Sequence, residues 1–197
     1  MKRKLAVVAF VICILLFVPL FGFRLYRFND SFYFSHIGMV ENSTYLKNNV
    51  IGYLCGVEDL DSSYFSLREI THMEDVKFLF GLFDVIFWLA LLFAVVLGIY
   101  LYKEGLFLGL RYSGCAIFVS LLCALVIDFN FLFTLFHKIL FRNNFWMLDS
   151  GSTLLKLFPV EFFMSFFAYI SIFSLIFAVI FVILSFAKVT TGQWKDL

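Results

Sequence analysis

Long apolar runs divided by shorter polar stretches are the main feature of this chain. Four runs are each close to the roughly 20 apolar residues that a helix needs to cross a bilayer. They are residues 5–23, 78–102, 106–127 and 162–187. The pattern therefore predicts an all-α polytopic membrane protein, a single membrane domain with four transmembrane helices.

Two polar stretches lie outside these runs. We expect residues 24–65 to form a small extracellular cap and residues 128–161 to form an outer interfacial loop. The pattern inside the cap is weak, because residues 32–38 are compatible with a short strand and residues 45–54 with a short helix. The four spans therefore dominate the predicted fold.

One polar helix runs directly into the second apolar run. Ser66 followed three residues later by Glu69 is a capping box, which predicts that a helix starts there. No Pro or Gly follows until Gly81, so the helix should continue over residues 67–102. At about 1.5 Å per residue it would be roughly 54 Å long, whereas the hydrocarbon core of a bilayer is roughly 30 Å thick. Part of this helix must therefore stand outside the hydrocarbon.

His72 lies on that protruding part, on an acidic turn with Glu69, Glu74 and Asp75. It precedes Phe78, where the apolar run begins, by six residues. This spacing places it roughly 9 Å beyond the hydrocarbon boundary, which is the depth of the lipid headgroups.

The composition excludes a soluble protein and suggests an orientation. Hydrophobic residues make up 63% of the chain, and thirty residues are Phe. Lys and Arg collect at the cytoplasmic flanks of spans. One side of the predicted bundle has seven basic and two acidic residues, and the other has eight basic and twelve acidic residues. The seven are Lys2, Arg3, Lys4, Lys103, Arg111, Lys188 and Lys195. Both termini are therefore predicted to be cytoplasmic.

Several kinds of site are not supported by any motif. The four cysteines form no C-x-x-C pair, and the three histidines form no H-x-x-x-H or H-E-x-x-H pattern. Neither a glycine-rich phosphate loop nor a G-x-S-x-G elbow is present. We therefore expect no metal, no cofactor and no nucleic-acid partner.

The second polar stretch holds a possible partner for His72. Asn130, Thr134, His137 and Asn144 recur at helical spacing on a Phe-rich segment, which predicts a narrow polar stripe at the outer interface. A single histidine there is more often structural than catalytic. His137, however, maps to the same leaflet and depth as His72. Because the unperturbed pKa of histidine is about 6.5, such a pair can move protons in both directions near neutrality without a cofactor.

Two long blocks of sequence surround these histidines. They are REITHMEDVKFLF at residues 68–80 and LFHKILFRNNFWMLDSGSTLLKLFPVEFF at residues 135–163. In the order and spacing of these blocks, and in the four-span plan, the chain resembles the lipoprotein intramolecular transacylases, a family of small bacterial membrane enzymes. It departs from the family pattern at Ser150, after Asp149, and at Val160, before Glu161.

The resemblance implies a reaction and its residues. His72 and His137 would be catalytic, at the junction of cap and membrane. We expect the supporting residues and the substrate pocket to include Glu69, Asp75, Trp146 and Asp149. The substrate would be a diacylglyceryl lipoprotein, whose sn-2 acyl chain moves through a cyclic tetrahedral intermediate to the α-amino group of the N-terminal cysteine. The product would be a lyso-form lipoprotein. One histidine would take the proton of the amine and the other would stabilise or protonate the ester oxygens, in either order.

The alternative is a non-catalytic membrane protein of the same shape. Trp146 and the many Phe residues fit an interfacial belt, but they also fit an acyl-chain pocket, as in a lipid- or lipoprotein-binding accessory protein. An enzyme should need both histidines, whereas a binding protein should tolerate their replacement. In either case we expect a monomer in the bacterial plasma membrane that meets membrane lipid, with the site at the outer leaflet.

Overall fold

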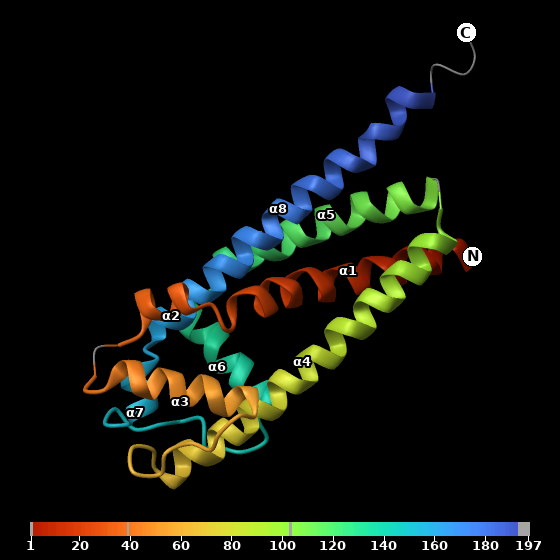
Figure 1. Ribbon diagram of the computed structural model, residues 1–197. Coiled ribbons are helices and arrows are strands. Elements are labelled where there is room, and N and C mark those ends of the chain that lie inside the picture. The colour runs from red at the N-terminus through yellow and green to blue at the C-terminus, as the bar shows by residue number, and fades with distance from the viewer. Residues whose placement is uncertain (1, 39, 103, 193–197) are drawn as a thin grey trace. The chain divides into compact units, whose positions relative to one another are not determined.

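The computed structural model of the protein describes residues 2–38, 40–102 and 104–192. These residues contain helices and no strand, which confirms the predicted all-α class (Figure 1). The helices are α1 (Lys2–Tyr26), α2 (Asp30–His36), α3 (Ser43–Cys55), α4 (Leu67–Tyr100), α5 (Glu104–Leu125), α6 (Phe129–Leu140), α7 (Thr153–Leu157) and α8 (Val160–Gly192). Lys103 and Lys195, which enter the charge count above, lie outside the described residues.

Four of the helices are long and apolar enough to cross a membrane, as predicted. They are Lys2–Tyr26, Leu67–Tyr100, Gly105–Leu125 and Val160–Phe186. At most 28% of the most apolar stretch of any of them is buried inside the protein. Most of their apolar side chains therefore face outward, which is the arrangement that lipid requires.

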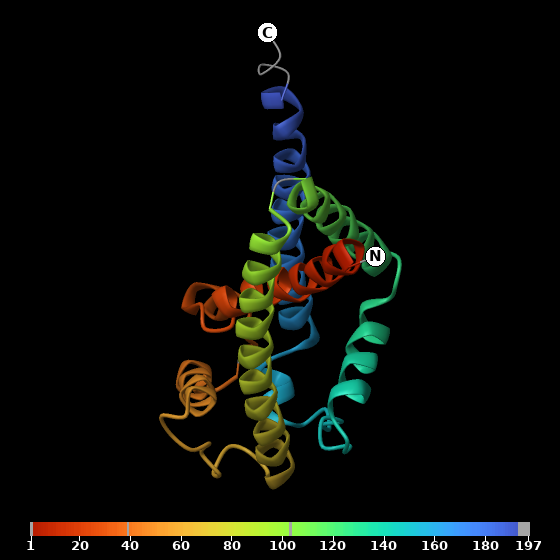
Figure 2. The same cartoon turned by 90° about the vertical axis from the view of Figure 1, so that its right-hand side faces the viewer.

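Helix α4 is the helix that the capping box predicts. The Ser66 backbone N–H donates to Glu69 Oε2 at 2.7 Å, and the Glu69 backbone N–H donates to Ser66 Oγ at 3.4 Å. The helix then runs unbroken to Tyr100, as Figure 2 also shows. Its 34 residues give a length of about 51 Å, more than the roughly 30 Å of hydrocarbon. The apolar part from Phe78 onward is long enough to cross, so His72 precedes the crossing part.

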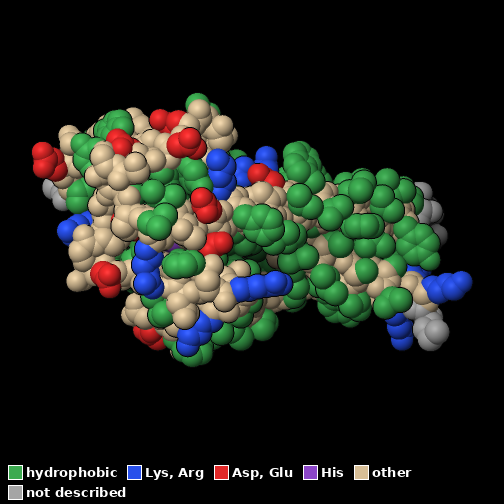
Figure 3. Space-filling model, turned by 90° about the horizontal axis from the view of Figure 1, so that it is seen from below, with side chains coloured by type: hydrophobic (Ala, Val, Ile, Leu, Met, Phe, Trp, Pro, Cys, Tyr) green, Lys and Arg blue, Asp and Glu red, His purple; other side chains and the backbone are tan. Residues whose placement is uncertain are grey.

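One compact unit contains the described parts of Met1–Phe23, Asp84–Val126 and Tyr169–Leu197. Its core includes a stripe on α1 formed by Val7, Phe10, Ile14 and Val18. These positions are three or four residues apart, which is the spacing of one helical face. Apolar side chains cover most of the visible surface of this unit in the right-hand half of Figure 3.

Helices α5 and α8 approach each other closely within this unit. A Cβ placed on Gly114 would lie 2.7 Å from the backbone oxygen of Ala178 and 2.7 Å from a methyl group of Val182. Only a residue without a side chain permits that distance, as is common where membrane helices pack through small residues. This contact holds the third and fourth membrane-length helices together.

The other compact unit contains Arg24–Phe83 and Ile127–Ala168, and it carries both candidate histidines. Its core joins aromatic and aliphatic side chains from several short helices. The buried members are Phe32, Tyr33, Leu46, Val50, Tyr53, Leu60, Phe65, Met73, Leu154, Leu157, Phe158 and Phe162. This core positions the start of α4 against the segment that follows α6.

The prediction of a short strand at residues 32–38 is wrong, because residues up to His36 belong to helix α2. Asn29 caps the helix, since its side-chain oxygen accepts from the Phe32 backbone N–H at 2.9 Å. The consecutive residues Phe32 and Tyr33 are both buried, which an alternating strand would not allow. The short helix expected at residues 45–54 is confirmed by α3.

Gly38 is required where the segment after α2 meets α7. Its backbone N–H donates to the Leu157 carbonyl oxygen at 2.8 Å. A Cβ at this position would overlap the backbone carbonyl oxygen of Lys156. The two segments can therefore approach this closely only with glycine at position 38.

Gly38→Ala should destabilise the protein by roughly 1–3 kcal/mol, because the new methyl group must push the α7 backbone away. The measurement is the melting temperature of the purified protein in detergent. Gly81→Ala is the matched control, since a Cβ there meets no atom within 4 Å. Equal melting temperatures for the two variants would show that the contact at Gly38 contributes nothing.

Candidate functional site

Helices α4 and α6 bring the two candidate histidines together. The His72 and His137 ring centroids are 6.1 Å apart, with 37° between the ring planes. Only 9% of His72 and 8% of His137 is exposed. The two lie 65 positions apart in sequence, so their proximity is a product of the fold.

The tautomer of His137 follows from its backbone contact. Its Nδ1 lies 2.7 Å from the Phe133 carbonyl oxygen, one helical turn earlier. A carbonyl oxygen only accepts, so Nδ1 must carry the hydrogen and donate it. The other ring nitrogen, Nε2, is then left with a free lone pair. Neutral His137 is therefore prepared to accept a proton at Nε2.

The Nδ1 atom of His72, unlike that of His137, makes no hydrogen bond among the described residues. This atom is also buried. Buried polar atoms are nearly always paired, and an exception calls for an explanation such as a catalytic role. The Nδ1 atom of His72 is thus available to a polar group of a bound molecule.

An aromatic wall surrounds the pair. The Phe141 ring centroid is 5.3 Å from that of His72 and 5.4 Å from that of His137. Phe133 and Trp146 lie on His137 at 4.2 Å and 5.0 Å, and Phe136 at 5.4 Å. Side chains of this kind keep water away from the imidazoles and offer contact to acyl chains.

Both histidines are held neutral by this environment. Burial, and to a smaller extent the neighbouring His137, lower the pKa of His72 to about 4, against the opposing charge of Asp75. Burial also lowers the pKa of His137, against the hydrogen bond to Phe133. Near neutral pH, each ring can therefore act as a proton acceptor.

The pKa of His72 should respond in opposite directions to two substitutions. His137→Gln should raise it, because the repulsion between two protonated rings is removed, and Asp75→Asn should lower it, because a stabilising negative charge is removed. Carbon-13 NMR of ring-labelled histidine measures this, since three histidines are readily assigned by single substitutions. A His72 ring that titrates at or above the ordinary value of about 6.5 would contradict the burial described above.

Glu69 is a structural clamp beside the site. Its Oε2 accepts from the backbone N–H and the hydroxyl of Ser66, each at 2.7 Å. Its Oε1 accepts from the Ser152 hydroxyl and the Leu154 backbone N–H, each at 2.8 Å. Burial raises the pKa of this carboxyl, but the hydrogen bonds outweigh burial and hold the pKa below its usual range. Glu69 therefore ties the start of α4 to the start of α7.

Asp75 links α4 to the loop that follows α6. It lies one turn after His72, and its Oδ2 accepts from the Asn143 side-chain amide at 2.8 Å. The Asn143 oxygen in turn accepts from the Phe145 backbone N–H at 3.0 Å. This chain of contacts fixes the loop that carries Trp146, so Asp75 connects the two histidine-bearing segments.

Asp149 and Asn144 do not meet the histidines. Asp149 is exposed, and its backbone carbonyl accepts from the Ser152 N–H at 2.9 Å in a turn. Asn144 was expected to continue the polar stripe of α6, but that helix ends at Leu140. Its carbonyl instead accepts from the Arg68 guanidinium at 2.6 Å.

Phe141 and Asn143 were not identified from the sequence. Phe141 is the C-cap residue of α6, where its backbone N–H donates to the His137 carbonyl. Asn143 lies two residues further on, in irregular backbone. Their proximity in sequence to His137 was the available signal, but the end of α6 decides which side they face.

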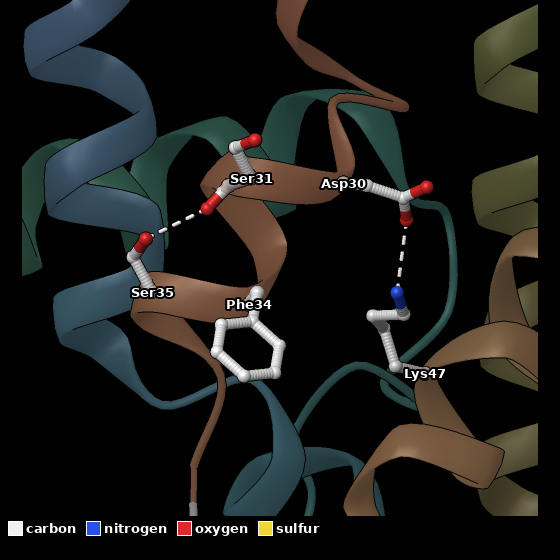
Figure 4. A pocket seen from close by; sticks show the side chains of 5 residues that line it. All are labelled: Asp30, Ser31, Phe34, Ser35 and Lys47. Atoms are coloured by element: carbon white, nitrogen blue, oxygen red, sulfur yellow. Dashed lines mark hydrogen bonds and ion pairs between the residues drawn. The ribbon is translucent and has the colours of Figure 1, made fainter.

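A separate hollow lies on α2 and α3. Its lining includes the ion pair between Lys47 Nζ and Asp30 Oδ1, 2.9 Å apart, together with Ser31, Phe34 and Ser35 (Figure 4). Neither His72 nor His137 lines it. The Ser35 hydroxyl also already donates to the Ser31 carbonyl. This hollow is therefore separate from the histidine pair.

Comparison with known families gives a match over most of the chain. The family described as lipoprotein intramolecular transacylase Lit matches residues 4–163. No curated protein sequence matches.

Solved structures share the fold. The membrane integral lipoprotein intramolecular transacylase Lit from Bacillus cereus is 21% identical, with a TM-score of 0.80 and coverage of 98% of each chain. Two variants of that protein, in which a histidine is replaced by arginine or by alanine, are each 22% identical with TM-scores of 0.77. They cover 98% of this chain and 94% and 96% of their own.

Proposed function

Because this chain belongs to the lipoprotein intramolecular transacylase family, it is a membrane acyltransferase that acts on lipoproteins, and we propose that His72 and His137 perform the transfer. The observation that carries this proposal is the buried pair of rings, 6.1 Å apart and walled by aromatic side chains. The substrate is a lipoprotein whose N-terminal cysteine bears a diacylglyceryl group. Its free α-amino group and its sn-2 ester are the two reacting groups.

The reaction moves one acyl chain and conserves all atoms. The amine nitrogen attacks the sn-2 ester carbonyl, a carbon–nitrogen bond forms, and the tetrahedral intermediate closes a ring within the substrate. The carbon–oxygen bond to glycerol then breaks. The proton lost by the amine ends on the freed sn-2 oxygen, so the product is an amide and a hydroxyl in a molecule of unchanged mass.

The geometry supports a division of labour between the histidines. The hydrogen bond from His137 Nδ1 to Phe133 leaves Nε2 as the acceptor for the amine proton. A proton held there can then pass to the leaving glyceryl oxygen. His72 is neutral near pH 7, so its N–H can donate to the oxyanion of the tetrahedral intermediate.

Positioning carries much of the rate enhancement. An α-amino group has a pKa of about 8, so part of the substrate is already neutral at pH 7. Two groups of one molecule held in contact react as if at very high concentration, with effective molarities on the order of 10⁵ M or more. The wall of Phe133, Phe136, Phe141 and Trp146 supports that role by holding the acyl chains.

We further propose that the site opens to the outer leaflet and that both termini are cytoplasmic. The distribution of basic residues supports this orientation. The excess length of α4 supports a position of His72 at headgroup depth. We propose a monomer with membrane lipid around it, and supporting roles for Glu69, Asp75 and Trp146 as described above.

Tandem mass spectrometry of a synthetic diacylglyceryl lipopeptide tests the function. The intact mass should stay constant after incubation with the purified protein, while fragmentation shows one acyl chain on the cysteine nitrogen. A lipopeptide that binds but is recovered unchanged would favour the accessory-protein alternative. Release of a free fatty acid would indicate a hydrolase.

A further inference from the structure

Helix α6 has an apolar face that no other described part of the protein covers. Phe131, Leu135 and Ile139 follow one another at intervals of four residues, so they form one face of the helix. They are exposed to 59%, 41% and 71% respectively. His137 is buried on the opposite side, with Phe133 one turn earlier.

The position of α6 in the chain places this face at the membrane surface. Residues 126–128 are all that separates it from the end of α5, which is long and apolar enough to span. Three residues reach at most about 11 Å. The twelve residues of α6 are about 18 Å long, too short to cross the hydrocarbon. An amphipathic helix held at this depth lies in the plane of the interface.

The charges near this face are mainly basic. Lys138 lies at the edge of the apolar face and Arg142 follows the helix, and both are exposed. Asp128 is at the other end, where its side chain caps the helix by accepting from the Phe131 backbone N–H at 3.0 Å. The C-terminal end of α6 therefore presents two cations next to exposed apolar side chains, which matches an anionic headgroup above acyl chains.

We propose that α6 is an interfacial anchor: its face formed by Phe131, Leu135 and Ile139 inserts among lipid acyl chains, while Lys138 and Arg142 bind anionic phospholipid headgroups. This anchoring sets the depth of His137 relative to the membrane, because His137 is on the opposite face of the same helix. The catalytic ring is thereby held at the level where a lipid-linked substrate carries its ester groups.

Spin labels test the anchor without reference to activity. In a variant whose native cysteines are replaced by serine, a label at Ile139→Cys in lipid nanodiscs should be accessible to oxygen and shielded from a water-soluble nickel complex. A label at Val57→Cys is the matched control, because Val57 is also apolar and 81% exposed but lies in the cap. It should show the reverse accessibility. Equal accessibility to nickel at both positions would overturn the proposal.

Lipid composition tests the headgroup contact. The label at position 139 should lie deeper in nanodiscs that contain phosphatidylglycerol than in nanodiscs of phosphatidylcholine alone. Lys138→Gln should remove that difference, whereas Lys156→Gln, an exposed lysine on α7, should leave it unchanged. The same depth in both lipids would overturn the anionic contact. A failure of acyl transfer in the separate lipopeptide assay would leave these depth measurements unaffected.

Discussion

Replacing either His72 or His137 by glutamine should nearly abolish acyl transfer by a protein that remains folded. Loss of the proton acceptor at His137 should lower the rate by about 10²–10⁴. Loss of the oxyanion donor at His72 should lower it by about 10²–10³. The measurement is the initial rate of N-acylation of a lipopeptide in detergent micelles or nanodiscs.

His36→Gln is the control for this pair, because His36 is the third histidine of the chain. In α2 its Nδ1 contacts the Phe32 carbonyl at 2.8 Å and its ring stacks on Phe32 at 4.5 Å. That contact is local to one helix, so His36→Gln should keep the rate of the native protein. Retention of a tenth or more of the native rate in either site variant would contradict a catalytic role for that histidine.

Glu69→Ala should cause the largest loss of stability. The substitution leaves the donors of Ser66, Ser152 and Leu154 without their acceptor. The Leu154 N–H is buried and costs about 1–3 kcal/mol when it is unpaired, and the part-buried donors of Ser66 and Ser152 add less, so the total is on the order of 3 kcal/mol. In a chain of this size that corresponds to a fall in melting temperature of roughly 6–12 °C. Thermal unfolding of the purified protein measures it.

Glu74→Ala is the matched control for this loss. Glu74 is an exposed carboxylate on the same helix, so its removal should leave the melting temperature nearly unchanged. The effect of Glu69 should also depend on pH. Because its folded pKa lies below the ordinary value, its stabilisation is complete above that value and disappears as the pH falls through the folded pKa. Equal melting temperatures for Glu69→Ala and Glu74→Ala would show that the hydrogen bonds of Glu69 do not stabilise the fold.

The helices of this fold could be predicted from the sequence where a local pattern determines them. The capping box of Ser66 and Glu69, followed by a stretch without Pro or Gly, predicted the start and continuity of α4. The apolar runs likewise predicted four membrane-length helices. The predicted strand at residues 32–38 failed because the Asn29 cap determines the conformation of a segment whose apolar pattern is ambiguous.

The site could be predicted only in part for a related reason. Membrane depth indicated that His72 and His137 share a level, but depth does not determine lateral distance. Their contact depends on how α6 packs against α4, and the side chains between them depend on where α6 ends. Phe141 and Asn143 follow that end, so no helical periodicity could assign them to the site. Glu69 was expected to support the site, and its hydrogen bonds join the start of α4 to the start of α7.

A crossover experiment tests the central claim most directly. A lipopeptide with a carbon-13-labelled sn-2 acyl chain is mixed with an unlabelled lipopeptide of different peptide mass and incubated with the native protein, with His72→Gln and with His137→Gln. Transfer within one substrate at the histidine pair predicts labelled N-acyl cysteine on the labelled peptide alone, and no transfer with either variant. Label on the second peptide, or undiminished transfer by a variant, would contradict the account.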